Sequence, residues 1–379
     1  MSAVPLDAAT SAREPSVAGN AGGRNAAVSR LGWMVGAYVG CIATALALCA
    51  ILVSATGGSA SKVFAALLDG SLRSPGAWGL TITTATPLLI VAMGTIVASK
   101  AGITNIGQEG QLLLGAAATA FVATRLDLPG PLLLTVSLLA ACVVGGLWAA
   151  LAAVMRFTRQ VPEVISTLLL VYIAFQVTTF GLTKKWLLLA RVNKTRTNNG
   201  EPLPATGHMP VITVFGNTIT WAVVIALLLT ATIGFVLART AVGFRLRMLG
   251  LNARTARRAG VSAVAFGGAA LVISGMTAGL AGGVWLTGGI AGDRFTGAIS
   301  SNIGWQGLLV ALLARERARL AIVMAFVFAA LRTGSGFLSA TGVDRRIADV
   351  VQAMLVLSLL IPPALEALRN HRRGTGMAS

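Results

Sequence analysis

Long stretches without a charged residue recur along this chain, and they constrain its fold more than any other feature. About twenty apolar residues in a row span a bilayer as an α-helix. Of the 379 residues, 55% are hydrophobic and 11% are charged, and the mean hydropathy is +0.81. Soluble chains carry roughly 25% charged residues. The sequence therefore predicts an all-α polytopic membrane protein.

The apolar runs divide the chain into a membrane domain, residues 31–368, and two polar tails. We predict about ten membrane segments, at 32–55, 79–98, 105–123, 131–154, 163–182, 217–238, 263–285, 303–314, 319–338 and 348–365. The eighth is short for a full span. Residues 1–30 show no periodicity and are expected to be disordered. Their apolar stretch begins too late for a signal peptide.

The basic residues predict the orientation. The net charge is +18, but these residues sit mostly in short loops, which indicates membrane orientation rather than nucleic-acid binding. Lys and Arg are more numerous in the loops that share a side with the N-terminus. Both termini, including the tail 369–379, are therefore predicted to be cytoplasmic (N-in/C-in). The basic loop 183–216, predicted to be periplasmic, is an exception to this bias.

The largest cytoplasmic connection, residues 239–262, has the pattern of a short capped helix. Asn252 suits an N-cap, and Gly260 suits the position just beyond a helix end. Arg247, Arg254 and Arg258 would share one face if the helix extended upstream. A positive-inside loop with no other role is the alternative, but a cap at each end of two helical turns favours a short helix that docks a cytoplasmic partner.

Two other segments place an acid at the predicted start of a membrane helix. In "NIGQEGQ", residues 105–111, Asn105 is a candidate N-cap, Gln108 would complete a capping box, and Glu109 falls in the first turn. Gly107 and Gly110 would allow close backbone approach. In "QVPEV", Pro162 fits the first helical position and Glu163 the first turn. We expect both starts to lie at the cytoplasmic face.

The segment 263–285 carries two rows of small residues, the first Ser274, Ala278 and Gly282, the second Gly275, Gly279 and Gly283. Such rows favour close helix packing in lipid, and this face could also line a substrate path. Polar candidates for that path are Asn302, Trp305 and Gln306. An interfacial tryptophan anchor with polar neighbours is the alternative interpretation.

The sequence lacks the motifs that indicate several kinds of catalysis and metal binding. We find no P-loop, no HExxH and no GxSxG motif. The three cysteines and two histidines are too scattered for a disulfide framework or a metal site. No series of ionisable residues of the kind used for proton relay occurs within the predicted segments. The chain is therefore predicted not to be an enzyme, and a secondary carrier is disfavoured.

Four motifs occur in order: "GITNIGQEGQLLLGA", "VPEVISTLLLVYIA", "GLNARTARRAGVS" and "ISGMTAGLAGG". Together they resemble permease subunits of bacterial ATP-binding-cassette (ABC) importers for branched-chain amino acids, simple sugars and nucleosides. The likeness covers roughly residues 35–365. The version "NIGQEGQ" is most similar to the nucleoside and simple-sugar branch.

The resemblance implies a type II importer-like permease in the bacterial inner membrane. Its partners would be separate ATPase subunits that bind ATP and Mg²⁺, a second permease that is a related chain, and a substrate-binding lipoprotein or periplasmic protein. No cofactor is expected in this chain.

The loop 239–262 would carry the coupling helix, and the residues matching the family's pattern there are Gly250, Asn252, Ala256 and Gly260. Relatives often have an acidic residue near position 254, whereas this chain has Arg254, Arg257 and Arg258, so the docking surface is expected to be more basic than usual. The start of the helix at Glu109 would be a packed hinge rather than a substrate site.

A nucleoside or simple-sugar permease is therefore our leading hypothesis. A permease for branched-chain amino acids is the alternative, and an ion-coupled secondary transporter is a further one. Each would move a solute without chemistry in this chain.

Overall fold

The computed structural model describes residues 59–190, 198–290 and 292–338, together with single positions between 36 and 54 and between 350 and 362. The single positions within the predicted segments 32–55 and 348–365 are helical. The remainder of those two segments and the tails 1–30 and 369–379 lie outside the described residues. The chain divides into two compact units, Met1–Leu48 with Leu357–Ser379, and Cys49–Val356. Every element described below belongs to the second unit.

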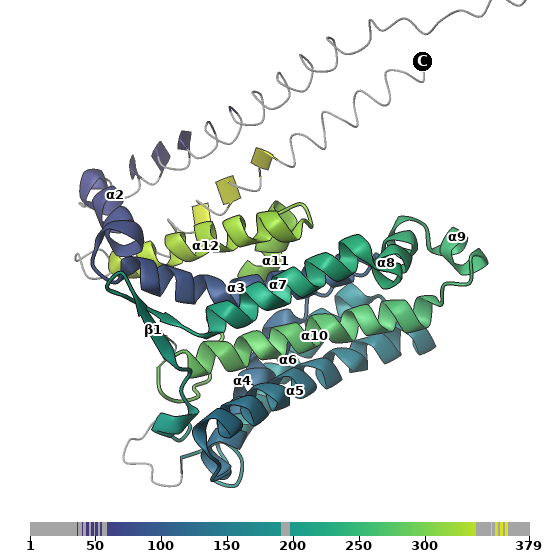
Figure 1. Cartoon of the computed structure of the whole chain (residues 1–379), viewed down its shortest axis with the longest axis horizontal. Coiled ribbons are helices and arrows are strands. Elements are labelled where there is room, and N and C mark those ends of the chain that lie inside the picture. The colour runs from purple at the N-terminus through teal and green to yellow at the C-terminus, as the bar shows by residue number, and fades with distance from the viewer. Residues whose placement is uncertain are drawn as a thin grey trace, which may run out of the picture. The chain divides into compact units, whose positions relative to one another are not determined.

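The second unit is a helical bundle with one small hairpin. In order, its elements are α2 (Ala60–Leu68), the π-helical turn η1 (Asp69–Arg73), α3 (Ala77–Lys100), α4 (Gln108–Arg125), α5 (Gly130–Arg159), α6 (Glu163–Gly181), the 3₁₀ turn η2 (Ala205–Gly207), β1 (Val211–Val214), β2 (Asn217–Thr220), α7 (Ala222–Arg239), α8 (Ala241–Leu251), α9 (Ala253–Arg258), α10 (Ala263–Thr287), α11 (Ile303–Leu313) and α12 (Ala318–Leu338). Figure 1 shows α8 and α9 at one end of the bundle and β1 at the other.

Within the described part of the chain, six helices are long and apolar enough to cross a membrane: α3, α5, α6, α7, α10 and α12. They coincide with six of the predicted segments. The helix α11 is apolar but shorter, as its predicted segment 303–314 indicated. The predicted segment 105–123 corresponds to α4, which begins three residues later than predicted.

The prediction of a helix from residue 217 is wrong at its start. Residues 217–220 form β2, which pairs antiparallel with β1, and Val214 opposes Asn217 across a two-residue turn. Both turn residues, Phe215 and Gly216, have positive φ, at 48° and 76°. That geometry matches the twist of a tight hairpin. The helix α7 can therefore begin only after the hairpin, at Ala222.

The centre of the bundle consists of α3 and α10. All residues of α3 from Thr86 to Ala98 are buried, and α10 packs against α3, α4 and α5. Glycines make this packing possible: a Cβ on Gly279 would collide with the Ala141 carbonyl oxygen of α5, and one on Gly282 with the Leu112 carbonyl oxygen of α4. The predicted small-residue rows are therefore confirmed as helix-packing surfaces.

Candidate functional site

The chain turns back into the bundle after α3, and this turn places the polar stretch "NIGQEGQ". Gly102 adopts a left-handed conformation, φ 73°, and α4 starts at Gln108. The Gln108 amide nitrogen donates to the Val91 carbonyl at 3.2 Å. Val91 precedes Lys100 by nine residues, about 13 Å at the rise of an α-helix. The helix α4 therefore begins well within the bundle, which differs from the predicted start at the membrane face.

Five side chains form a buried network around this start, which we call the polar junction: Thr95, Asn105, Gln108, Gln111 and Ser274. Each is at most 3% exposed. The Ser274 hydroxyl of α10 accepts from the Asn105 and Gln108 amides, both at 3.0 Å. The Thr95 hydroxyl of α3 donates to Gln108 Oε1 at 2.8 Å. A fully satisfied buried network specifies one arrangement of the helices that carry it.

The predicted capping box is wrong. The residue at the N-cap of α4 is Gly107, without a side-chain hydrogen bond. Asn105 Oδ1 accepts from the Gly107 N–H at 3.0 Å, and its amide nitrogen donates to Gln111 and Ser274. Gln108 bonds to α3 and α10 instead of turning back to Asn105. Partners on other helices have replaced the local cap.

The carboxylate of Glu109 caps a different helix from its own. Its Oε1 accepts from the Asn302 N–H at 3.1 Å and its Oε2 from the Gly304 N–H at 2.7 Å. These are donors at the start of α11, where Asn302 itself makes no side-chain cap. The side chain of Glu109 is 1% exposed. A carboxylate is well placed there, because the first N–H groups of a helix have no intrahelical partner and carry partial positive charge.

The glycines of this region allow the close approach that the sequence predicted. A Cβ on Gly107 would lie 2.9 Å from the Thr167 carbonyl oxygen of α6, and one on Gly110 would lie 2.9 Å from Val171 Cα. A Cβ on Gly304 would lie 2.5 Å from Glu109 Cα. Backbones of α4, α6 and α11 therefore meet around the polar junction.

The predicted path residues lie around the start of α11. The backbone of Asn302 adopts a left-handed conformation, φ 65°, and its side chain is exposed, whereas Trp305 and Gln306 are half-buried. Sequence reasoning did not connect them to Arg332 of α12, which donates to Gln306 Oε1 at 3.2 Å and to the Ser301 carbonyl at 2.9 Å. The guanidinium also lies 5.6 Å from the Trp285 ring centre. The sequence did offer one indication of this site, because Arg332 is a single arginine inside an apolar run, and such residues often mark functional positions.

The helix α9 has both predicted caps. Asn252 Oδ1 accepts from the N–H groups of Arg254 and Thr255 at 3.0 and 3.1 Å. Gly260 follows the helix with φ 78°. Ala256 is fully buried, while the three predicted docking arginines, Arg254, Arg257 and Arg258, are exposed.

The shared face predicted for Arg247, Arg254 and Arg258 is not formed. Asn252 has an extended backbone, φ −157° and ψ 99°, so α8 and α9 are separate helices. Gly250, at the end of α8, rests against the turn after α3, where its Cβ would lie 2.5 Å from the Lys100 carbonyl oxygen.

Glu163 lies in the first turn of α6, as predicted, although Pro162 occupies the N-cap rather than the first helical position. The Glu163 carboxylate pairs with Arg156 Nε of α5 at 3.2 Å. This ion pair joins the end of one candidate span to the start of the next.

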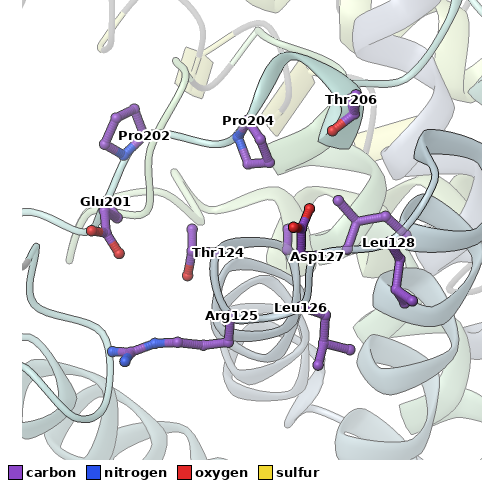
Figure 2. Close-up of a pocket in the computed structure, with 11 residues that line it drawn as sticks. Thr124, Arg125, Leu126, Asp127, Leu128, Glu201, Pro202, Pro204 and Thr206 are labelled. Carbon is purple, nitrogen blue, oxygen red and sulfur yellow. The ribbon is translucent and has the colours of Figure 1, made fainter.

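A separate cavity of about 380 Å³ lies at the far end of α4 from Glu109. Figure 2 shows Thr124, Asp127, Glu201 and Thr206 around it. It is lined by the end of α4 and the loop after it, by Leu133 of α5, and by residues between Glu201 and Thr206. It shares no residue with the polar junction.

These features define a polytopic membrane protein whose glycine-packed helices enclose a polar junction and whose short arginine-rich helix is exposed at one end. Its sequence matches the family described as branched-chain amino acid transport system / permease component over residues 79–360. The chain belongs to this family, and it is the transmembrane permease subunit of an ABC transporter.

Individual relatives cover most of the chain. It is 32% identical over 310 residues to the glucose ABC transporter permease protein TsgB13 of Haloferax volcanii, covering 78% of this chain and 79% of the relative. It is 29% identical to the guanosine ABC transporter permease protein NupP of Bacillus subtilis, covering 82% and 89%. For the nucleoside ABC transporter permease protein NupB of Lactococcus lactis the identity is 27%, covering 84% and 88%. No solved structure matches the chain.

Proposed function

We propose that this permease forms the translocation path for a nucleoside or a simple sugar in an importer, and that separate subunits hydrolyse ATP. The observation that carries the coupling is α9, a helix capped at both ends with three exposed arginines. A cap at each end keeps so short a helix formed, so its arginines are presented in a fixed arrangement. The named substrates of the relatives support a hydroxylated, uncharged solute.

The proposed assembly follows from the family. Two guanosine permease proteins of Bacillus subtilis, NupP and NupQ, both resemble this chain, which supports a second, related permease as partner. We further propose ten membrane helices, cytoplasmic termini, location in the bacterial inner membrane and delivery of substrate by a binding protein. ATP and Mg²⁺ would bind the ATPase partner, and this chain would hold no cofactor.

The proposed path begins at the α11 start, with Asn302, Trp305 and Gln306, where Arg332 bonds to Gln306 and lies over the Trp285 ring. Amide, guanidinium and indole groups can bind hydroxyls and flat rings. The polar junction would hold the surrounding helices in register rather than touch the solute, because its groups already bond to one another.

Uptake by the reconstituted complex is expected to depend on ATP and to continue after the proton gradient is collapsed. Vesicles containing the permeases and ATPase are supplied with the binding protein and labelled guanosine or glucose. Competition with unlabelled nucleosides, sugars and leucine then ranks the substrate classes. Competition by leucine alone would favour the branched-chain amino acid alternative, and uptake without the ATPase would favour an ion-coupled carrier.

Reversing the charge of Arg254, Arg257 and Arg258 to glutamate should weaken ATPase association about ten-fold or more, because interfacial charge pairs become repulsive. Co-purification and uptake measure the effect. The matched control reverses Arg159, Arg239 and Arg319, which are also exposed, and should retain the ATPase. Undiminished association of the α9 variant would remove the docking role.

A further inference from the structure

The β1–β2 hairpin ends in an apolar turn that no part of the proposed function uses. We call residues 214–216 the hairpin tip. Phe215 is fully exposed, and Val214 beside it is 42% exposed. The backbone of Phe215 has φ 48°, a left-handed conformation that glycine and asparagine adopt readily and a bulky side chain adopts rarely. A fully exposed ring held in an unfavourable backbone conformation indicates that the ring itself contacts something outside the chain.

The hairpin is fixed to the ends of three candidate membrane spans, at the end of the bundle opposite α9 (Figure 1). Asn217 Oδ1 accepts from the Gly79 N–H of α3 at 3.2 Å. The strand β2 leads directly into Trp221, the N-cap of α7. Before β1, the Met209 N–H donates to the Thr287 carbonyl at the end of α10, at 2.9 Å. The hairpin therefore lies at the level where α3 and α7 begin and α10 ends.

Exposed tryptophans occur at the same level. Trp78, in the first turn of α3, is 46% exposed, and Trp221 is 48% exposed. Both flank the hairpin, because Trp78 precedes the residue that bonds to Asn217 and Trp221 follows β2. Tryptophans at the ends of membrane spans are typical of the boundary between lipid and water. This boundary is therefore expected at the level of the hairpin.

The protein surface next to Trp78 is apolar. A groove of about 170 Å³ lies between α3, α7 and α12, and Thr86 is the one polar residue in its lining. The Thr86 hydroxyl donates to the Ile82 carbonyl of its own helix at 3.0 Å. Leu227 in the lining is exposed, so the groove opens outward. Phe326 also lines the groove and stacks on Trp78, with ring centres 5.5 Å apart. Acyl chains can therefore contact this side of the bundle up to the level of the hairpin.

The distribution of charge distinguishes the hairpin from the rest of its loop. Residues 209–238, which contain the hairpin and the span that follows it, include no charged side chain, whereas residues 183–201 carry five basic residues and one acid. Charged side chains are costly within a bilayer, while an interface with a soluble protein has a polar rim. An uncharged hairpin that continues into an apolar span therefore favours lipid over a soluble protein as the contact of the tip.

We propose that the β1–β2 hairpin is a membrane anchor, in which Phe215 and Val214 insert into the lipid leaflet at the end of the spans opposite α9. Insertion removes from water an aromatic ring that the chain itself leaves uncovered. Because the hairpin is bonded to the start of α3, the anchor sets the depth in the membrane of the central helix of the bundle. This role does not depend on which solute the permease carries.

The first test locates the tip by spin labelling of the permease complex in vesicles of phosphatidylglycerol and phosphatidylcholine. Cys41, Cys49 and Cys142 are replaced by alanine, and a nitroxide is attached at Phe215→Cys. Oxygen concentrates among acyl chains, whereas a charged nickel chelate stays in water. The ratio of oxygen to nickel collisions should be several-fold higher at this position than at the control Lys185→Cys, which is exposed in the charged part of the same loop.

Two outcomes of the labelling would overturn the proposal. Equal ratios at the two positions would place the tip in water. A label that is shielded from both oxygen and nickel would place the tip against protein instead of lipid.

The second test separates the ring from the folding of the hairpin. Phe215→Asn creates the Asn–Gly pair that this two-residue turn prefers, so the hairpin should form at least as well, and the unfolding temperature in detergent should not fall. A nitroxide at Val214→Cys should nevertheless become several-fold more accessible to nickel in vesicles. Phe215→Trp, which restores an interfacial ring, should keep that label protected. Unchanged nickel access in Phe215→Asn would show that the ring does not anchor the hairpin.

Discussion

Glu109→Ala is expected to destabilise the permease by about 3 kcal/mol or more and to abolish most uptake. The substitution leaves the N–H groups of Asn302 and Gly304 without their acceptor in a buried site, and each unsatisfied buried group costs about 1–3 kcal/mol. Thermal unfolding of the purified complex measures the stability. Uptake that survives should keep its substrate preference, since the buried Glu109 carboxylate bonds to backbone N–H groups of the α11 start and leaves the side chains of the proposed path in place.

The matched control for this substitution is Glu163→Ala, which also removes an acid from the first turn of a helix. The Glu163 side chain remains 13% exposed and pairs with an arginine that is 39% exposed. We expect a smaller loss, about 1 kcal/mol, because water can replace part of that pair. A clean change of substrate specificity in Glu109→Ala would show that the carboxylate lies in the path.

Gly279→Ala should destabilise the bundle by about 3 kcal/mol, at the upper end for overpacking a well-filled interior. The added Cβ would meet the Ala141 carbonyl oxygen of α5 and would lie 3.1 Å from Gly145 Cα. Both obstacles are backbone, so α5 and α10 must separate. Loss of assembled complex on gel filtration and a lower unfolding temperature report the effect.

Gly268→Ala is the control within the same helix. Its Cβ would lie 3.8 Å from Phe157 Cε2, which is ordinary van der Waals contact. This variant should be neutral or slightly stabilising, because alanine favours a helix over glycine. Equal losses in both variants would show that glycine serves α10 for some reason other than close packing.

The membrane helices were predictable because the signal lies within each segment. A long apolar run specifies a span by itself, and the six helices of the described residues that are long and apolar enough to cross a membrane follow such runs. The caps of α9 were predictable for the same reason, since Asn252 acts on residues two and three positions ahead. The hairpin before α7 was missed because its polar strand, Asn217–Thr220, adjoins an apolar run and was included in the helix.

The polar junction was located but misinterpreted. Its three amides and the neighbouring carboxylate of Glu109 stood out between apolar runs, yet their partners are distant along the chain. Asn105 bonds to Ser274, 169 residues away, and Glu109 bonds to Gly304, 195 residues away. Capping rules consider only neighbours within one turn, so they assigned these side chains to their own helix. The contact of Arg332 with Gln306 escaped prediction for the same reason.

Residues on either side of the turn between α3 and α4 hold the two ends of α11. The Lys100 Nζ lies 2.7 Å from Oε2 of Glu316, just beyond the last turn of α11. The Glu109 carboxylate bonds to N–H groups at the first turn of α11. The helix α11 between these two contacts is about 16 Å long. Because a helix is stiff along its axis, it keeps the two contacts at a fixed separation. Gly250, three residues before α9, packs against the same turn, where its Cβ would lie 2.9 Å from the Gly102 backbone nitrogen. A displacement of α8 at the arginine-rich end would therefore be transmitted through the turn between α3 and α4 to the start of α11.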